Sequence, residues 1–586
     1  VEGPALDWQT LPARVEAVIA ERIGRLAEPL QAELRVASVE GETFTAEVVA
    51  RVQAASEGEV AGRLSRELDR RHRLVRAQGI LWMDGQRLSR YRFRHALFQR
   101  YLYKSLDAVE RAHLHAAVGN TLETLHGGQT EAMAAVAGQL AWHFQEAGMA
   151  AKAIDYLRQA GDRALRLGAY QEAIAHLSRG LELLLTLPDS GGEEHHLERD
   201  QQELALQLSL GTAWIRRGAL GPEQAGPAFA RARELCEQMG KESQLCQVLG
   251  ELAIFHYLRA EHHRAIELAE EALSLAQQFG DPVHLALGHW QLGVASFGLG
   301  EYTAARAHLQ QVISFYEPQE HHLALVSLRG LDAGVTSLSF DACCLWALGY
   351  PEQASKRSEE VLALARELDH PFSLADGLAF GGCMYNRMRR EPCGLKDAAD
   401  ELLSLSQQGG FPGWLAIVSP FQGAAAAMLG QLQEGIAQIR EGMAAGQTIG
   451  MRVDLPGSLC TLAEALAKAG QPEQGLVTLA EAFALVEETD GRHWEAELHR
   501  VQGELLLMQG DDAEAEASLH KAIEVARGQS AKSWELRATT GLARLWQELG
   551  KREEARQVLA QIYGWFTEGF ETPDLREAEA LLGELS

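Results

Sequence analysis

A pattern of small side chains returns every 40 residues in the C-terminal third of the chain. The positions that share this spacing are Gly423, Ala463, Gly503 and Ala543. A glycine follows each of them after seven residues, and another small residue follows after twelve. A helical hairpin needs small residues where its helices cross closely and a glycine where the first helix ends. The period therefore predicts a solenoid of stacked helix pairs.

The same spacing can be followed back toward the N-terminus as far as Gly161. Ten frames occur, and nine carry a small residue at both of the first two positions. The offsets match the small-residue pattern of the tetratricopeptide repeat, with longer helices. We expect an all-α fold: a right-handed tetratricopeptide-type superhelix of about ten 40-residue pairs over residues 161–566. Residues 567–586 should form a capping helix, and extra chain is predicted near 187–199 and 317–336.

The first hundred residues have a different pattern. Residues 1–10 resemble a linker, and helical spacing is predicted over about 11–26, 29–38, 46–52 and 59–71. Two short strands should follow around Val75 and Arg92, separated by a turn at Met83–Gly85. Helices followed by a small hairpin predict a winged-helix domain over residues 11–106, joined to the solenoid by connecting helices over 107–160.

Charge limits the classes of partner. The formal net charge is −27, which argues against a general polyanion-binding protein. Between Arg63 and Lys104, however, twelve Lys and Arg stand against three Asp and Glu. This local excess fits either a DNA-binding wing or a face that is solvated or docks within the protein, and we favour the second. Nucleic-acid binding is not expected of the solenoid.

Cysteine usage and apolar run length bear on the compartment. The seven cysteines are odd in number and contain no CxxC, which favours a reduced, cytoplasmic environment. No apolar run is long enough to span a bilayer, and no signal peptide is visible, so no membrane partner is expected. Because Val1 is not a natural start, we interpret the sequence as a fragment of a longer protein.

The segment Phe93-Arg94-His95-Ala96-Leu97 resembles the F-x-H-A-L motif that ends the winged helix of STAND-type signalling ATPases. The resemblance implies that His95 contacts the phosphates of ADP in the intact protein. The alternative is a half-buried histidine that caps the next helix. No GxxxxGK[ST] occurs, so no enzyme activity is expected here, and ADP, ATP and Mg²⁺ would require the missing nucleotide-binding domain.

The array also resembles the sensor half of a bacterial group of STAND proteins with cyclase or DNA-binding outputs. The segments that carry this likeness are 349–354, 364–373, 495–500 and 563–570. The resemblance implies that an effector (a small molecule, peptide or protein) binds the concave solenoid face and controls an upstream ATPase domain and oligomerisation. Two alternatives are a constitutive protein-binding scaffold and a DNA-binding regulator acting through Arg90, Arg92 and Arg94.

The effector site is predicted in the irregular repeats between Leu331 and Gln422, where aromatic residues, arginines, Gly and Pro are dense. Aromatic, Arg and Asn side chains in a channel suit ligand or peptide binding, although each could instead pack between helices. The candidate ligand-binding residues are Asp332, Tyr385, Asn386, Arg387, Arg389, Arg390, Trp414 and Gln422.

No catalytic or metal-binding constellation is predicted. The adjacent histidines His195-His196, His262-His263 and His321-His322 would point about 100° apart on a helix and could not chelate one ion. We expect these pairs at loop or solvated positions.

Overall fold

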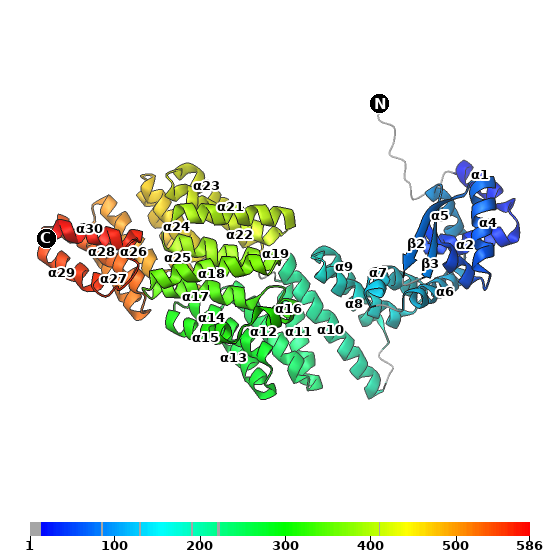
Figure 1. Cartoon of the computed structure of the whole chain (residues 1–586), viewed down its shortest axis with the longest axis horizontal. Helices are drawn as coiled ribbons and strands as arrows, with labels where there is room; N and C mark the ends of the chain where they lie inside the picture. The colour runs from blue at the N-terminus through cyan, green and yellow to red at the C-terminus, as the bar shows by residue number, and fades with distance from the viewer. Residues whose placement is uncertain (1–12, 84–85, 128–129, 189–191, 219–222, 410) are drawn as a thin grey trace, which may run out of the picture. The chain divides into compact units, whose positions relative to one another are not determined.

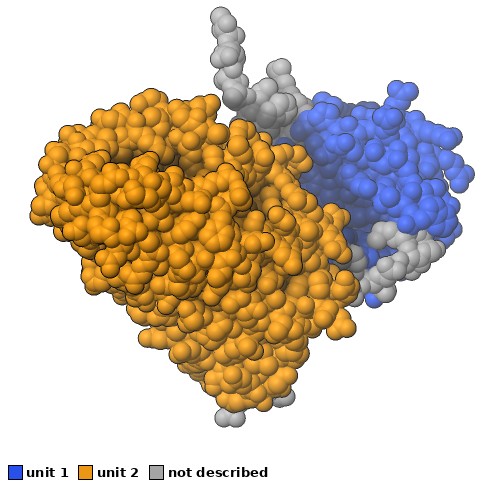
Figure 2. All heavy atoms as spheres, turned by 60° about the vertical axis from the view of Figure 1, so that its left-hand side comes forward, with its two compact units in different colours: residues 1–210 blue, residues 211–586 orange. Residues whose placement is uncertain are grey.

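The computed structural model describes residues 13–586 except 84–85, 128–129, 189–191, 219–222 and 410. The chain divides into two compact units, residues 1–210 and 211–586, which Figure 2 colours separately. The division falls inside the stretch predicted as one solenoid.

The first unit begins with short helices and a small sheet. Its first elements are α1 (Ala13–Gly24), α2 (Glu28–Glu40), β1 (Thr43–Thr45), α3 (Ala46–Val52), α4 (Glu57–Arg63), the π-helical η1 (Leu64–Arg71), β2 (Val75–Met83) and β3 (Gln86–Phe93). The sheet is antiparallel with the order β1-β3-β2. Buried apolar side chains from the helices and the sheet, among them Leu34, Phe44 and Phe93, form one core. The predicted helices and strands are all present, although most of the turn expected at Met83–Gly85 lies outside the described residues.

Longer helices complete this unit: α5 (Ala96–Ser105), α6 (Ala108–His126), α7 (Thr130–Glu146), α8 (Ala150–Arg166), α9 (Tyr170–Thr186) and α10 (Glu193–Gly218). Asp107 caps α6, since its carboxylate accepts hydrogen bonds from the Val109 and Glu110 amides. The division between the units falls within α10.

The second unit is a stack of helix pairs (Figure 1). Its helices are α11 (Ala225–Met239), α12 (Glu242–Leu258), α13 (His262–Phe279), α14 (Pro282–Gly298), α15 (Tyr302–Phe315), α16 (Pro318–Arg329), α17 (Ala333–Ala347), α18 (Pro351–Glu367), α19 (Pro371–Asp376), the π-helical η2 (Gly377–Met384), α20 (Tyr385–Met388), α21 (Pro392–Gly409), α22 (Pro412–Met428), α23 (Leu432–Thr448), α24 (Leu455–Lys468), α25 (Pro472–Thr489), α26 (Glu495–Gln509), α27 (Asp512–Gly528), α28 (Lys532–Glu548), α29 (Arg552–Tyr563) and α30 (Pro573–Leu585). Many begin with proline, whose fixed φ suits the first helical turn. The extra chain expected near 317–336 is largely the additional helix α16.

The small residues allow neighbouring helices to touch backbone to backbone. A Cβ added at Gly423 would lie 2.7 Å from the Gly435 carbonyl oxygen, and one added at Gly435 would lie 2.6 Å from that of Gly423. The glycines that end the first helices, Gly430, Gly470, Gly510 and Gly550, all have positive φ. The predicted α-solenoid is thus confirmed. Gly423 and Gly435 lie at a close helix crossing, and the repeating glycines end the first helices, as their spacing predicted.

Repeats that are distant in sequence also touch within the second unit. The Arg452 amide donates to the Leu258 carbonyl, and the Ser533 hydroxyl donates to the Trp346 carbonyl. In both cases the end of the first helix in one pair meets the beginning of a pair five further along. Successive turns of the superhelix are therefore hydrogen-bonded to each other. We call these bonds the turn-to-turn contacts.

Candidate functional site

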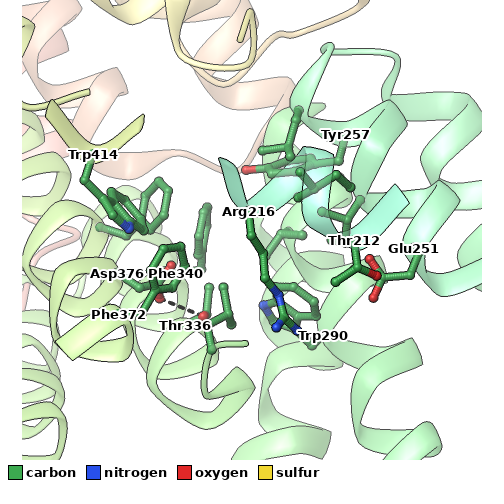
Figure 3. A pocket seen from close by; sticks show the side chains of 16 residues that line it. Thr212, Arg216, Glu251, Tyr257, Trp290, Thr336, Phe340, Phe372, Asp376 and Trp414 are labelled. Carbon is green, nitrogen blue, oxygen red and sulfur yellow. Dashed lines mark hydrogen bonds between the residues drawn. The ribbon is translucent and has the colours of Figure 1, made fainter. Parts of the chain in front are cut away.

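A cavity lies among the first helices of successive pairs in the second unit. It holds about 740 Å³ of empty space, part of which is open to solvent. Side chains from α10, α12, α14, α17, α19, η2 and α22, and from the loop before α17, form its wall (Figure 3). The lining residues are Thr212, Ile215, Arg216, Glu251, Ile254, Tyr257, Leu258, Trp290, Val294, Leu331, Thr336, Phe340, Phe372, Asp376, Phe380 and Trp414. We call this space the aromatic cavity.

Aromatic rings make up much of the wall. Phe340 and Phe380 have their centroids 5.1 Å apart, and the Trp414 ring lies 5.5 Å from Phe372 and 6.2 Å from Phe380. These separations are those of mutually stabilising aromatic pairs, so the rings hold one another in place. A rigid apolar wall with a few polar groups is the usual form of a small-molecule site.

Asp376 is one of two buried acids on this wall, with Glu251, and is only 2% exposed. Its Oδ2 accepts a hydrogen bond of 2.7 Å from the Thr336 hydroxyl, the dashed line in Figure 3. Burial raises the pKa of Asp376 to about 7, and the nearby Asp332 carboxylate adds to the rise, while the Thr336 hydrogen bond opposes it. The carboxyl group therefore changes charge near neutral pH.

Trp414 contributes a polar atom as well as a ring. Its Nε1 is buried and has no hydrogen-bond partner among the described residues. A buried N–H without an acceptor costs free energy, about 1–3 kcal/mol. A ligand with an acceptor atom would recover that loss.

The other polar side chains lie on α10 and α12. Figure 3 shows the Arg216 side chain running toward Trp290, on the side of the cavity away from Asp376. Glu251 is buried on α12.

A second cavity, with about 630 Å³ of empty space that is partly open to solvent, shares Tyr257, Leu258 and Phe380 with the first. Its remaining wall is mostly apolar and includes Met443 and Met451.

Of the eight predicted ligand-binding residues, Trp414 lines the aromatic cavity and seven do not. Asp332 is fully buried as the cap of α17, where its carboxylate accepts from two amides and the Tyr316 hydroxyl and lies 2.7 Å from His322 Nδ1. Asn386 donates to the Gly382 carbonyl, and Gln422 donates to Asp400.

The predicted arginines join acidic groups from later repeats. Arg387 Nη2 lies 2.5 Å from Asp454, and Arg390 Nη2 lies 3.0 Å from Glu464 and 3.4 Å from Glu497. Arg389 donates to the Tyr385 hydroxyl and lies over that ring. The structure assigns these arginines contacts within the protein, and ligand binding by them stays a prediction.

The aromatic cavity lies partly within the stretch that the sequence predicted for the effector site, but most of its lining residues were not among the predicted ones. Seven lining residues fall in the predicted stretch 331–422: Leu331, Thr336, Phe340, Phe372, Asp376, Phe380 and Trp414. Asp376 was missed because nothing in its local sequence distinguishes it from an ordinary helical acid. Tyr257 and Trp290 were missed because they lie on regular repeats.

His95 is exposed at the start of α5, where its Nδ1 accepts from the Leu97 amide at 3.4 Å. This is the helix-capping role that the sequence left open. A phosphate contact stays a prediction.

One expectation about the paired histidines was wrong. His262 is 1% exposed, and neither ring nitrogen has a hydrogen-bond partner among the described residues. Burial, with smaller contributions from His493 and His263, lowers its pKa to about 3, so the ring is neutral. The turn-to-turn contacts bury this side chain, since a Cβ added at Gly298 or Gly491 would meet its ring.

Across the described ranges, no group of three or more His, Cys, Asp or Glu has an arrangement that could hold a metal ion. No helix in the same ranges has both the length and the apolar character needed to cross a bilayer.

A match to a protein-family model supports the repeat assignment for part of the second unit. A tetratricopeptide repeat model matches residues 454–528, and no curated protein matches the chain. Among solved structures, a Rap protein complexed with competence and sporulation factor is 12% identical, with 74% of this chain and 99% of that one covered and a TM-score of 0.36. A STAND protein with a tetratricopeptide repeat sensor from Pyrococcus horikoshii is 12% identical over 90% and 68% of the two chains, with a TM-score of 0.34. The Cut9–Hcn1 assembly of the APC/C is 12% identical over 84% and 86%, with a TM-score of 0.44.

Proposed function

We propose that this chain is the sensor region of a bacterial STAND-type signalling ATPase, and that its effector binds in the aromatic cavity. The observation that carries the effector site is the cavity itself, an aromatic wall that also holds the buried carboxyl groups of Asp376 and Glu251 and the buried Trp414 Nε1, which has no hydrogen-bond partner among the described residues. Such convergence of a few polar groups in an apolar space is what a specific small ligand requires.

The N-terminal elements support the STAND assignment. The order helix, strand, two helices and two strands, with β1 beside β3, is the one expected of a winged helix. The F-x-H-A-L segment follows directly, with His95 exposed at the helix start. DNA binding through this hairpin is the weaker alternative, because Arg92 pairs with Glu42 and Arg94 pairs with Asp69.

Effector binding would act by shifting a conformational equilibrium. The cavity wall is built from helices of several successive pairs, and the turn-to-turn contacts fix how those pairs are wound. A ligand that binds one winding of the superhelix more tightly than another would increase the population of the winding that it binds more tightly. In the intact protein, that preference would reach the upstream nucleotide switch and control oligomerisation.

The test is native mass spectrometry of the purified chain, comparing wild type with Leu331→Trp. Leu331 lines the cavity and is partly buried, so the larger ring would fill the space. Leu429→Trp is the matched control, since Leu429 is 46% exposed and lies outside the cavity. We expect a small molecule to copurify with wild type and the control and to be lost from Leu331→Trp. Equal retention by all three proteins, or no bound molecule in any, would overturn the proposal.

A further inference from the structure

We infer that the ligand of the aromatic cavity carries an organic ammonium group, which pairs with the carboxylate of Asp376 against the surrounding aromatic rings. This inference rests on the proposed function and names the chemical class of the effector.

Asp376 differs from other buried acids of the second unit because no basic side chain among the described residues is paired with it. Other buried acids of the second unit have basic partners: Asp341 lies near Arg306 and Arg357, and Glu497 pairs with Arg500. Among the described residues, no Lys, Arg or His forms an ion pair with Asp376. A buried carboxylate is costly unless it is paired and hydrogen-bonded, and here the Thr336 hydroxyl meets only part of that need.

Elsewhere in the second unit, two arginines are each paired with an acid and stacked on two aromatic rings. Arg387 pairs with Asp454 while its guanidinium lies 4.9 Å from the Phe421 centroid and 4.8 Å from that of Trp494. Arg537 repeats the arrangement, bonded to Asp574 and Glu497 and stacked on Trp346 and Trp534. In both places a cation is paired with an acid, partly buried in Asp454 and buried in Asp574 and Glu497, and lies over two aromatic rings.

Around Asp376 the aromatic cavity has the acid and the rings of this arrangement, but among the described residues no Lys, Arg or His is paired with that acid. Phe372, Phe380 and Trp414 share the wall with Asp376, and Figure 3 shows Arg216 directed to Trp290 instead. An ammonium ion over aromatic faces is attracted by the negative faces of the rings, and the attraction is stronger when the ion is desolvated beside a carboxylate. A cationic ligand group would therefore take, beside Asp376, the position that Arg387 and Arg537 occupy beside the other acids.

The rest of the ligand follows from the remaining wall. The empty space exceeds a bare ammonium ion, and its other walls are apolar, so the ligand has an apolar body. The Trp414 Nε1 has no hydrogen-bond partner among the described residues, so the ligand should offer it an acceptor, such as a carbonyl or ether oxygen. The class is an amine or quaternary ammonium compound with an apolar portion and one acceptor oxygen.

The test is calorimetric titration of the full chain with three probes that share a chain length: octylammonium, octanol and octanoate. We expect octylammonium to bind at least tenfold more tightly than octanol, and octanoate more weakly than both. Asp376→Asn should remove the preference for octylammonium and leave octanol binding within about twofold. Asp400→Asn, at an exposed acid outside the cavity, should retain the preference.

The outcomes separate this inference from the proposed function. If octanol binds as tightly as octylammonium, and Leu331→Trp abolishes both, the cavity is a ligand site but the ammonium inference is wrong. If octylammonium binds equally to wild type and Asp376→Asn, with circular dichroism showing both folded, the inference is also wrong. If no probe binds and nothing copurifies, both proposals are wrong.

Discussion

The hydroxyl of Tyr302 donates a 2.6 Å hydrogen bond to the carbonyl oxygen of His493, although 191 residues separate the two. The Trp534 Nε1 in turn donates to the Tyr302 hydroxyl at 3.3 Å. All three residues are buried. One phenol thus connects three helix pairs and is the central member of the turn-to-turn contacts.

Replacing Tyr302 with Phe should destabilise the second unit by about 1–3 kcal/mol, because a buried carbonyl and a buried indole N–H would both lose their partner. The midpoint of urea unfolding measures the loss. Tyr350→Phe is the control, since Tyr350 is partly buried and packs its ring on Trp565. Equal midpoints for the two variants would contradict the role given to the Tyr302 hydroxyl.

Gly423→Ala should be strongly destabilising, because the added Cβ would meet the backbone of α23 at 2.7 Å and neither helix can yield locally. We expect a loss of about 1–3 kcal/mol. Gly528→Ala provides the comparison, as a Cβ there meets nothing within 4 Å, and it should be neutral or slightly stabilising. Thermal unfolding distinguishes the two, and a neutral Gly423→Ala would argue against backbone-to-backbone packing.

Arg500→Met should cost about 3–5 kcal/mol, since it leaves the buried Glu497 and the partly buried Glu464 with less compensation. The exposed pair between Arg556 and Glu553 is the matched case, and Arg556→Met should change stability by less than about 1 kcal/mol. Denaturant midpoints for the two variants should differ clearly. Similar midpoints would show that the buried ions contribute no more than surface pairs.

Asp376 should make stability depend on pH. Its pKa is about 7 in the folded chain and near the ordinary aspartate value of 3.8 when unfolded, so the folded state holds the extra proton between these values. The contribution of Asp376 to stability is therefore full below pH 4 and is lost as pH rises through 7. The groups around it are Thr336 and Asp332, with Glu251 and Arg216 on the same cavity wall.

Asp376→Asn removes this titration. The unfolding temperature of the variant, minus that of wild type, should increase from pH 4 to pH 7 and then level off. A difference that stays constant across this range would mean that Asp376 titrates normally in the folded protein.

Local sequence predicted most of the helices and their close crossings. Gly423 and Gly435 reveal a helix crossing because small residues at a fixed offset have one common packing cause, and Asp107 reveals a cap because its partners lie two and three residues ahead. The cavity could not be read in this way. Thr212 and Trp414 share one wall only because of the pitch of the superhelix, and the sequence of a single repeat does not determine that pitch.

The predicted arginine site illustrates the same limit. Arg387 and Arg390 looked available for a ligand, yet Asp454, 67 residues later, and Glu497, 107 residues later, bind them. His262 looked solvated until the following turn of the superhelix buried it. Interactions across that distance depend on the winding of the whole unit.

The turn-to-turn contacts also bear on how the second unit folds. In most repeat proteins each repeat touches only its neighbours, so unfolding can start at an end and proceed in steps. Here bonds such as Tyr302–His493 close loops of almost 200 residues, which raises the contact order and makes assembly slow. Once closed, the early and late repeats stabilise each other, and the unit should lose its structure in one cooperative transition.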